Sequence, residues 1–305
     1  MNTGIAITGG RKINGKISLH GAKNSVLPIL AATTLIEGVS LIHNCPKLTD
    51  VTAAIQILEH LGADVAMEGD TVRVDCSEIT RFDIPEELMR EMRSSIVFLG
   101  AIAARMGKAS LCSPGGCELG PRPIDLHLNS LSDLGVEIEE SHGLINCTCS
   151  NGICGTSLHL SFPSVGATEN IILAAVTGEG VTVIHGAARE PEISDLADFL
   201  NRAGANIQGA GSDVITVCGV KSLHGTEHTI IPDRIEAATY LAAAAVTGGK
   251  IILNNAIPAH LTPVMSVLKS AGCEIKVSNR QISLISPVRL KRVPVIRTMP
   301  HPGFP

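Results

Sequence analysis

An internal repeat restricts the possible folds of this chain more than any other feature. One element combines a turn of small residues with a short strand, and it occurs four times, as EGVSLIHN, MGKASLCS, EGVTVIHG and GGKIILNN. The glycines that mark it are Gly38, Gly107, Gly180 and Gly249, so the period is roughly 70 residues. A second element follows each copy at a similar distance and is marked by Gly62, Gly135, Gly204 and Gly272. Because two independent markers agree, the sequence predicts one structural unit that is repeated along the chain.

Within each unit, the apolar spacing predicts helices that alternate with strands. One class of helix covers residues 50–61, 123–134, 192–203 and 262–271, and a second class covers residues 86–105, 164–177 and 233–247. The helices at 164–177 and 233–247 are apolar on nearly every side, so we expect them inside a bundle with sheets around it. A fifth unit begins at 288–297 and stops at RTMPHPGFP, where its helix should begin, so we expect a truncated sequence.

Composition and charge argue against several classes of function. Aromatic residues make up 2% of the chain, too few for a surface that stacks single-stranded nucleic acid. A formal net charge of −5 without a basic block argues against binding to a phosphate backbone. The N-terminus has no apolar signal region and no apolar run is long enough to cross a bilayer, so we expect a cytoplasmic protein without membrane contact. Nine cysteines without a secretion signal indicate reduced thiols.

One loop carries a cysteine between hinge residues. The stretch PGGCELGPRP, residues 114–123, combines Cys117 with three glycines and three prolines, and Arg122 follows five residues later. Glycines give backbone freedom and prolines restrict the flanks, as in a lid that brings a thiol to a bound substrate. A thiol with an ordinary pKa of about 8.5 is mostly protonated at neutral pH, and a nearby guanidinium favours the thiolate. Cys117 is therefore a candidate acid or nucleophile, and an unused surface thiol is the alternative.

The segment GAKNSVLP places polar residues where an apolar helix begins. Lys23 and Asn24 come just before this helix, and Asn24 or Ser25 is expected to cap it. The free N–H groups and the dipole of a helix N-terminus favour an anion, and Lys23 adds a full positive charge. A surface lysine beside an ordinary cap is the alternative interpretation.

Two further helix starts and one arginine are candidates for ligand binding. RPIDLH places Arg122 and Asp125 at a helix N-terminus, and FPSVG does the same with Ser164 and Gly166. Both segments can equally be plain helix starts. Arg93, in REMRSSIVFLG, lies where a charged half-helix becomes apolar. Its guanidinium can bind a phosphate with two hydrogen bonds, or it can simply extend from the apolar surface to water.

Other charged groups and possible metal ligands have weaker patterns. Carboxylates before a helix usually interact with its dipole, which accounts for Glu190 and Glu192, and for Asp233 and Glu236 beside Arg234. Half of a metal site is suggested by Cys147, Cys149 and Cys154, and by the pair His224 and His228. Neither group has the second half that zinc spacing requires, so we expect no metal site.

Taken together, several long motifs resemble one family of enzymes. GAKNSVLP, MRSSIVFLG, PGGCELGPRPID, FPSVGATENI, AREPEISDLADFL, IIPDRIEA and TMPHPGFP resemble segments of the UDP-N-acetylglucosamine 1-carboxyvinyltransferases, the enolpyruvyl transferases that begin peptidoglycan synthesis. The resemblance is collinear from Arg11 to Pro305. It implies an inside-out α/β barrel fold, with two similar domains of three repeat units each and the ligands bound between them. In this chain, residues 22–230 would form a complete first domain, and residues 1–21 and 231–305 an incomplete second one, so that four full units and part of a fifth are present.

The resemblance also implies the chemistry. The enolpyruvyl group of phosphoenolpyruvate moves to the 3′-hydroxyl of UDP-N-acetylglucosamine by addition and elimination, with release of phosphate and without a metal or cofactor. Cys117 matches the lid cysteine, which protonates the vinyl carbon and can become attached to phosphoenolpyruvate. Lys23 and Asn24 match the phosphoenolpyruvate site, with Lys23 also counted as catalytic, and Arg93 and Arg122 match the anion-binding set. The segments expected to hold the UDP-sugar comprise Arg122, Pro123, Ile124, Asp125 and Leu126, together with Ser164, Val165 and Gly166.

Two departures from the family pattern bear on these expectations. Some members carry a lysine two residues before the serine of FPSVG, where this chain has Phe162. In the family, TMPHPGFP is followed by Thr-Asp, whose carboxylate is the base for the sugar hydroxyl and would lie just beyond Pro305. We therefore expect negligible turnover from residues 1–305 alone. The alternatives are a non-catalytic homologue that binds only the UDP-sugar and an incomplete gene model, while the cysteine lid and RPIDLH argue against the sister transferase of the shikimate pathway. The oligomeric state is open.

Overall fold

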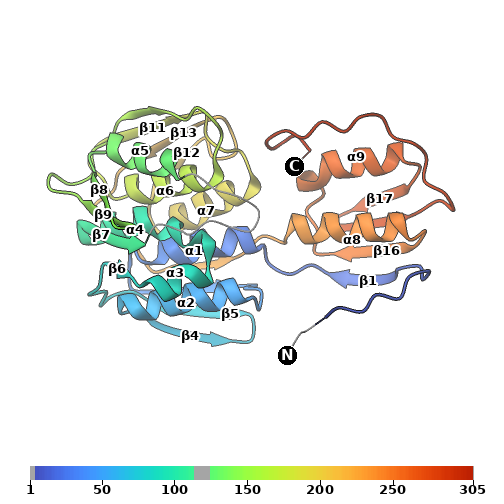
Figure 1. Cartoon of the computed structure of the whole chain (residues 1–305), viewed down its shortest axis with the longest axis horizontal. Coiled ribbons are helices and arrows are strands. Elements are labelled where there is room, and N and C mark those ends of the chain that lie inside the picture. Colours follow the sequence, from blue (N-terminus) through green and yellow to red (C-terminus); the bar gives the residue numbers. More distant parts are fainter. Residues whose placement is uncertain (1–3, 113–123, 305) are drawn as a thin grey trace. The chain divides into compact units, whose positions relative to one another are not determined.

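A computed structural model describes residues 4–112 and 124–304 of the chain. The chain folds as two compact units (Figure 1): the large unit, Gly21–Ile231, and the small unit, Met1–His20 with Pro232–Pro305. Both ends of the sequence therefore contribute to the small unit, and the large unit is formed by one continuous stretch of chain.

Within residues 4–112 and 124–304, four four-stranded sheets share the same strand order, three in the large unit and one in the small unit. The first is β15 (Glu227–Thr229), β3 (Val39–His43), β5 (Thr71–Asp75) and β4 (Asp64–Glu68). The second is β6 (Asp83–Ile84), β7 (Lys108–Cys112), β9 (Leu144–Thr148) and β8 (Glu137–Ser141). The third is β10 (Ser157–His159), β11 (Val181–His185), β13 (Val214–Cys218) and β12 (Asn206–Gln208). The sheet of the small unit is β1 (Asn14–Ser18), β16 (Lys250–Asn254), β18 (Gln281–Ile285) and β17 (Glu274–Ser278).

The pairing within these sheets follows one rule. The first strand of each sheet pairs in parallel with the second, and the other two pairings are antiparallel. The second strand is in every case the strand of the first glycine-marked element, namely β3, β7, β11 or β16. A separate two-stranded pairing joins β14 (Leu223–His224) to β2 (Ile36–Glu37). No sheet closes on itself among the strands of residues 4–112 and 124–304.

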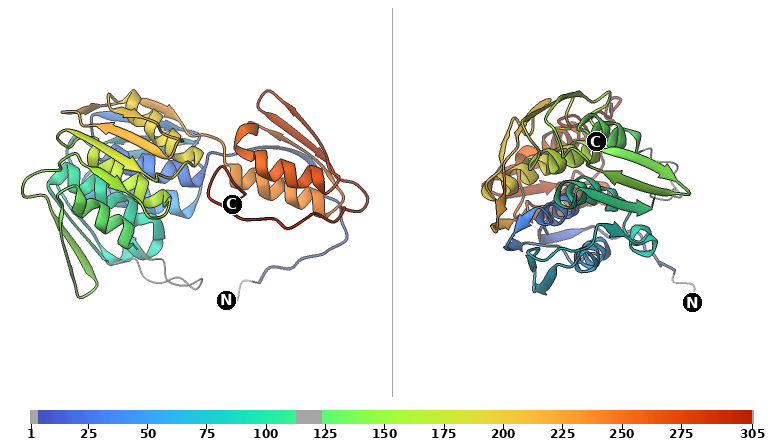
Figure 2. Two further views of the ribbon diagram at one scale, coloured as in Figure 1. Left: turned by 90° about the horizontal axis from the view of Figure 1, so that it is seen from above. Right: turned by 90° about the vertical axis from the view of Figure 1, so that its left-hand side faces the viewer.

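Three apolar helices form the centre of the large unit, with the sheets outside them (Figure 2). They are α1 (Lys23–Thr33), α4 (Phe98–Met106) and α6 (Val165–Ala175). α1 packs against α2 (Thr49–Leu61) and α7 (Pro191–Arg202), and α6 packs against α4 and α5 (Asp125–Asp133). α6 is buried without interruption from Ala167 to Ala175, as expected for a helix that is apolar on nearly every side.

One predicted helix is wrong. Residues 86–105 do not form a single helix but α3 (Glu86–Glu91), the 3₁₀ helix η1 (Arg93–Val97) and α4. Met92 interrupts it with an extended backbone, at φ −129° and ψ 107°, and its side chain is fully buried in the large core. The apolar spacing of the sequence continues across Met92 and so does not reveal the break. Met92 is buried by tertiary packing, although its backbone is not helical.

The small unit differs from the prediction in the burial of its long helix. α8 (Arg234–Val246) packs on one face against the sheet strands β16 and β18, the 3₁₀ helix η2 (Pro258–Leu261) and α9 (Thr262–Ser270). Its buried residues are Ala237, Leu241, Ala244 and Ala245. Ile235 is 48% exposed and Val246 is 75% exposed, so the expectation that this helix lies inside a bundle is wrong for this unit. None of the helices in the two described ranges has the length and apolar character to span a membrane.

Candidate active site

The first candidate segment lies at the start of α1. Lys23 and Asn24 are the first two residues of the helix, and the N-cap is Ala22, which makes no side-chain capping bond. The predicted cap at Asn24 or Ser25 is therefore wrong, because the N-cap lies two to three residues earlier. The Lys23 ammonium forms an ion pair with the Asp50 carboxylate in the first turn of α2. A positive charge thus stands at a helix N-terminus, as the anion hypothesis requires.

A buried polar cluster fixes this end of α1, and sequence reasoning did not identify it. The Ser25 hydroxyl donates to the Asp195 carboxylate of α7. The same carboxylate accepts from His228 Nε2 at 2.9 Å and from the Ile231 amide at 3.3 Å. Ser25, Asp195 and His228 are all at most 5% exposed. Because three donors converge on one buried carboxylate, α1 is held to α7 and to β15 next to Lys23.

The possible metal ligands do not converge. His224 and His228 lie on different strands, β14 and β15, and their rings bind different partners, the Gly225 carbonyl and Asp195. Cys147 is buried in β9 and Cys154 is exposed. Within the described residues there is no group of three or more His, Cys, Asp or Glu side chains that could hold a metal ion.

The second and third candidate segments lie at the starts of α5 and α6. Ile124 is the N-cap of α5 without a capping side chain, and Asp125 is exposed in the first turn. At α6 the cap is Ser164, whose Oγ accepts from the Ala167 amide at 3.3 Å. Ser164, Val165 and Gly166 are partly exposed, so their backbone is accessible at this helix start.

His127 brings these two helix starts together. A Cβ atom at Gly166 would lie 2.8 Å from His127 Cε1 and 3.1 Å from His127 Nε2, so the imidazole occupies the space beside this glycine. α5 and α6 pack against each other along this contact. The residues expected to hold the UDP-sugar, at 124–126 and 164–166, are therefore neighbours although they are far apart in the sequence.

Burial changes the ionisation of two groups beside these segments. Burial lowers the pKa of His127 to about 4, although the charge of Asp125 acts in the opposite direction. Burial also raises the pKa of the Glu169 carboxyl well above its usual value, and the charges of Glu192 and then Glu190 raise it further. His127 is therefore neutral near pH 7, burial favours the neutral form of Glu169, and neither group was singled out from the sequence.

The remaining candidates fall into three groups. Cys117, Arg122 and Pro123 lie outside the described residues. Arg93 is the first residue of η1. The charged groups at the start of α8 have structural partners: Asp233 accepts from the Ile235 and Glu236 amides at 2.7 and 3.0 Å, and Glu236 bonds to His20 Nδ1 at 2.9 Å.

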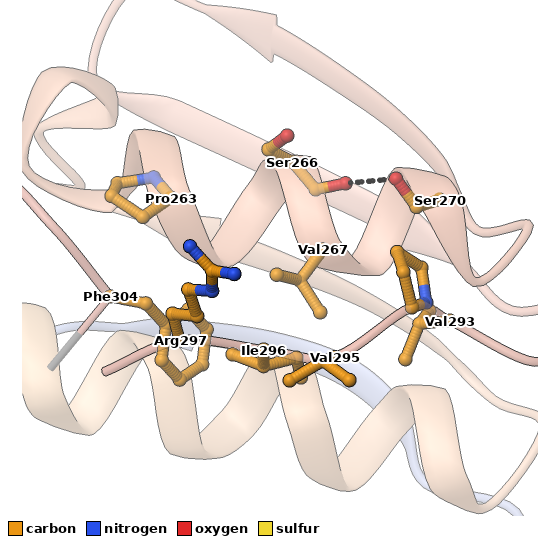
Figure 3. A pocket seen from close by; sticks show the side chains of 10 residues that line it. Pro263, Ser266, Val267, Ser270, Val293, Val295, Ile296, Arg297 and Phe304 are labelled. Carbon is orange, nitrogen blue, oxygen red and sulfur yellow. Dashed lines mark hydrogen bonds between the residues drawn. The ribbon is translucent and has the colours of Figure 1, made fainter. Parts of the chain in front are cut away.

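A cavity of about 300 Å³ lies in the small unit (Figure 3). Pro263, Ser266, Val267 and Ser270 of α9 line one side, and the segment 293–297 with Phe304 lines the other. The Arg297 guanidinium extends toward α9 (Figure 3). Since none of the residues predicted to bind ligand lines this cavity, it is not the candidate site.

Comparison with solved structures identifies the fold as that of the enolpyruvyl transferases. The crystal structure of the enolpyruvyl transferase NikO from Streptomyces tendae superposes with a TM-score of 0.84 at 23% identity, covering 97% of this chain and 71% of NikO. An EPSP synthase from Acinetobacter baumannii superposes with a TM-score of 0.70 at 20% identity, covering 91% of this chain and 65% of that one. The family model of EPSP synthase (3-phosphoshikimate 1-carboxyvinyltransferase) matches residues 7–305.

Sequence comparison specifies the branch of this family. A UDP-N-acetylglucosamine 1-carboxyvinyltransferase 2 of Caldanaerobacter subterraneus is 54% identical over 98% of this chain and 72% of its own length. A UDP-N-acetylglucosamine 1-carboxyvinyltransferase 1 of Symbiobacterium thermophilum is 47% identical over 100% of this chain and 70% of its own length. The chain belongs to the UDP-N-acetylglucosamine 1-carboxyvinyltransferases, a group of transferases within the EPSP synthase family. The resemblance carried by GAKNSVLP, PGGCELGPRPID and FPSVGATENI is thereby confirmed.

Proposed function

We propose that this protein transfers the enolpyruvyl group of phosphoenolpyruvate to the 3′-hydroxyl of UDP-N-acetylglucosamine, the first committed step of peptidoglycan synthesis. The observation that most supports a site for this reaction is the contact between His127 and Gly166, which joins the starts of α5 and α6. Two accessible helix N-termini side by side provide the N–H groups that a diphosphate or a carbonyl oxygen binds. The names of the relatives supply the identity of the two substrates.

Different residues of the family motifs would bind the two substrates. Phosphoenolpyruvate would be bound by Lys23 and Asn24, with Arg93 and Arg122 completing the anion site. Since Lys23 already forms an ion pair with Asp50, its ammonium would bridge to the phosphate or exchange partners when the substrate binds. The UDP-sugar would be held by residues of two segments, Arg122, Pro123, Ile124, Asp125 and Leu126 in the first and Ser164, Val165 and Gly166 in the second.

The reaction would proceed in two stages. Cys117 donates its thiol proton to C3 of phosphoenolpyruvate, and the sugar 3′-oxygen forms a bond to C2, giving a tetrahedral adduct. The hydroxyl proton leaves to a general base, which the family has in the aspartate that follows TMPHPGFP. In the second stage, C3 loses a proton and C2 loses inorganic phosphate, which restores the double bond. Proton transfer and anion binding account for every step, so no metal is needed.

The architecture of the whole family is part of the same proposal. We infer that the large and small units correspond to a complete domain and part of a second domain, with boundaries near residues 22 and 230. Three sheets with one strand order support three repeat units of an inside-out α/β barrel in the large unit. The matching sheet of the small unit supports a fourth repeat unit. A cytoplasmic location also belongs to this proposal.

The experiment that tests the function measures the alkylation rate of each cysteine by mass spectrometry, with and without the two substrates. Burial raises the pKa of Cys45, Cys76 and Cys147 to about 12, so these thiols should react slowly at pH 7. Cys154 is exposed and is the main competitor, so the assay uses Cys154→Ser as its background variant.

On this background, Cys117 is expected to react fastest, and UDP-N-acetylglucosamine is expected to change its rate. When phosphoenolpyruvate is added with the UDP-sugar, the alkylation rate of Cys117 should fall, because phosphoenolpyruvate occupies the thiol. Equal labelling of several cysteines that neither substrate alters would contradict the proposed function. A change caused by the sugar alone, with no effect of phosphoenolpyruvate, would favour a protein that only binds the UDP-sugar.

A further inference from the structure

One buried asparagine connects the two helix starts of the candidate site. Asn170 of α6 is fully buried, and its side chain reaches three other segments. Its Oδ1 accepts from the Gly100 amide of α4 at 2.7 Å, and its Nδ2 donates to the Ile96 carbonyl of η1 at 3.0 Å. The same Nδ2 lies 2.8 Å from His127 Nδ1 on α5. All the hydrogen-bonding atoms of this amide are therefore engaged.

The partners of Asn170 determine the state of the His127 ring. A backbone amide only donates, so the atom that faces Gly100 must be the amide oxygen. A carbonyl only accepts, so the atom that faces Ile96 must be the NH₂ group. Because an NH₂ group has no lone pair to offer, His127 Nδ1 must be the acceptor and carries no proton. The proton of the ring then lies on Nε2, and a second proton on Nδ1 would meet the hydrogens of the amide.

The Nε2 edge of this ring lies against Gly166. The distance from an added Cβ to Nε2 would be 3.1 Å, so no larger residue fits at 166 while the ring keeps its place. His127 is 8% exposed, so it has little space to move elsewhere. The position of the ring consequently sets the distance between the start of α5 and the start of α6.

We propose that Asn170 is a positioning residue for the UDP-sugar site: its amide fixes the orientation and tautomer of His127, and the His127 ring holds segment 124–126 at the required distance from segment 164–166. This inference rests on the proposed function for the identity of the ligand. Asn170 and His127 touch neither substrate in this account, and they act through the backbone of the two segments. If Asn170 only filled the core, a change in the tautomer of His127 would not be accompanied by a change in the affinity for the ligand.

The experiment combines nitrogen NMR of the imidazoles with titration of UDP-N-acetylglucosamine. In the unmodified protein, His127 should show a protonated Nε2 and an unprotonated Nδ1 at pH 7. Asn170→Asp replaces the NH₂ donor with an acceptor, so His127 Nδ1 should become protonated. The matched control is Asn129→Asp, which adds the same charge to the exposed side of α5. UDP-sugar affinity should fall about tenfold or more in Asn170→Asp and remain unchanged in the control.

Each result bears on a separate claim. A His127 ring that carries its proton on Nδ1 in the unmodified protein overturns the inference without any variant. If Asn170→Asp does not fold, His127→Gln replaces it: an amide oxygen can still accept from Asn170, but the ring beside Gly166 is lost, and UDP-sugar affinity should again fall. Unchanged affinity in a folded variant overturns this inference alone. No binding of UDP-N-acetylglucosamine by the unmodified protein overturns the proposed function, and this inference with it.

Discussion

α6 in the large unit and α8 in the small unit start with similar caps but differ in how much of each helix is buried. Each follows a side-chain cap, Ser164 or Asp233, and each is apolar on nearly every side. α6 is buried over nine consecutive residues, whereas α8 buries four residues on one face. An apolar helix pattern therefore predicts a helix but not how many of its sides are covered.

The residues at equivalent positions of the two helices differ in the same way as the burial of the helices. Counted from the cap, Asn170 of α6 corresponds to Thr239 of α8, and Gly166 corresponds to Ile235. Asn170 bonds to three other segments, while the Thr239 hydroxyl donates only to the Ile235 carbonyl of its own helix. A helix that is covered on all sides needs partners for every polar group and small residues at close contacts, and an open helix needs neither.

The largest expected effect compares Asn170→Ala with Thr239→Ala. Removing the Asn170 amide takes away its hydrogen bonds to the Gly100 amide, the Ile96 carbonyl and His127 Nδ1, which should lower the free energy of unfolding by about 3 kcal/mol or more. Thr239→Ala removes an exposed hydroxyl and should change it by less than about 0.5 kcal/mol.

Urea denaturation can follow the two units separately. Tyr240 of α8 is the only tyrosine in a chain without tryptophan, so its fluorescence reports on the small unit, and amide NMR signals report on α6. Equal effects of the two alanine variants would contradict the difference between the helices.

A second expected difference is in pH dependence. The pKa of His127 falls from 6.5 to about 4 on folding. Below pH 6.5, His127 therefore binds a proton in the unfolded chain, but in the folded large unit it binds one only near pH 4. The free energy of unfolding thus keeps its full value above pH 6.5 and falls as the pH decreases from 6.5 to about 4. The loss should approach about 3 kcal/mol, at 1.36 kcal/mol for each pKa unit. This contribution of His127 to the pH dependence should be absent in His127→Gln. The measurement is the difference between the urea midpoints at pH 7 and pH 4.5, compared between the variant and the unmodified protein. An unchanged pH dependence in that variant would show that the ring is not protected from protonation.

A smaller effect is expected from Gly166→Ala and Ile235→Ala. The added methyl group at Gly166 would collide with the His127 ring and should cost about 1 to 3 kcal/mol. Ile235→Ala trims a side chain that is 48% exposed and should cost about 1 kcal/mol or less. The cost at Gly166 should largely disappear in the double variant with His127→Ala, because the colliding ring is then absent. A cost that persists in the double variant would place its cause outside the His127 contact.

Local features of this fold were predictable from the sequence, and long-range ones were not. The helices at 50–61, 123–134, 164–177, 192–203, 233–247 and 262–271 are present with ends that differ by at most two residues, because apolar spacing and caps are local signals. The break at Met92 was missed because it depends on packing. So was the amide of Asn170, whose partners lie 43 to 74 residues away in the sequence.

The candidate site shows the same division. Ser164 caps α6 as its position in FPSVG suggested, since a cap needs only the next three residues. The clusters of Ser25 with Asp195 and of His127 with Gly166 join separate helices, so no spacing within one motif reveals them. Two local signs point to the approach of these helices: a histidine that is the third residue of α5, and a glycine two residues after the cap of α6.

We propose that this chain binds UDP-N-acetylglucosamine where α5 and α6 begin. Titration of the ligand into ¹⁵N-labelled protein, followed through the backbone amide signals, tests this binding site. We expect the largest shifts at 124–126 and 164–166, while the signals of Val267 and Ser270, which line the cavity beside α9, stay in place. No shifts at saturating ligand, or shifts confined to the small unit, would contradict it.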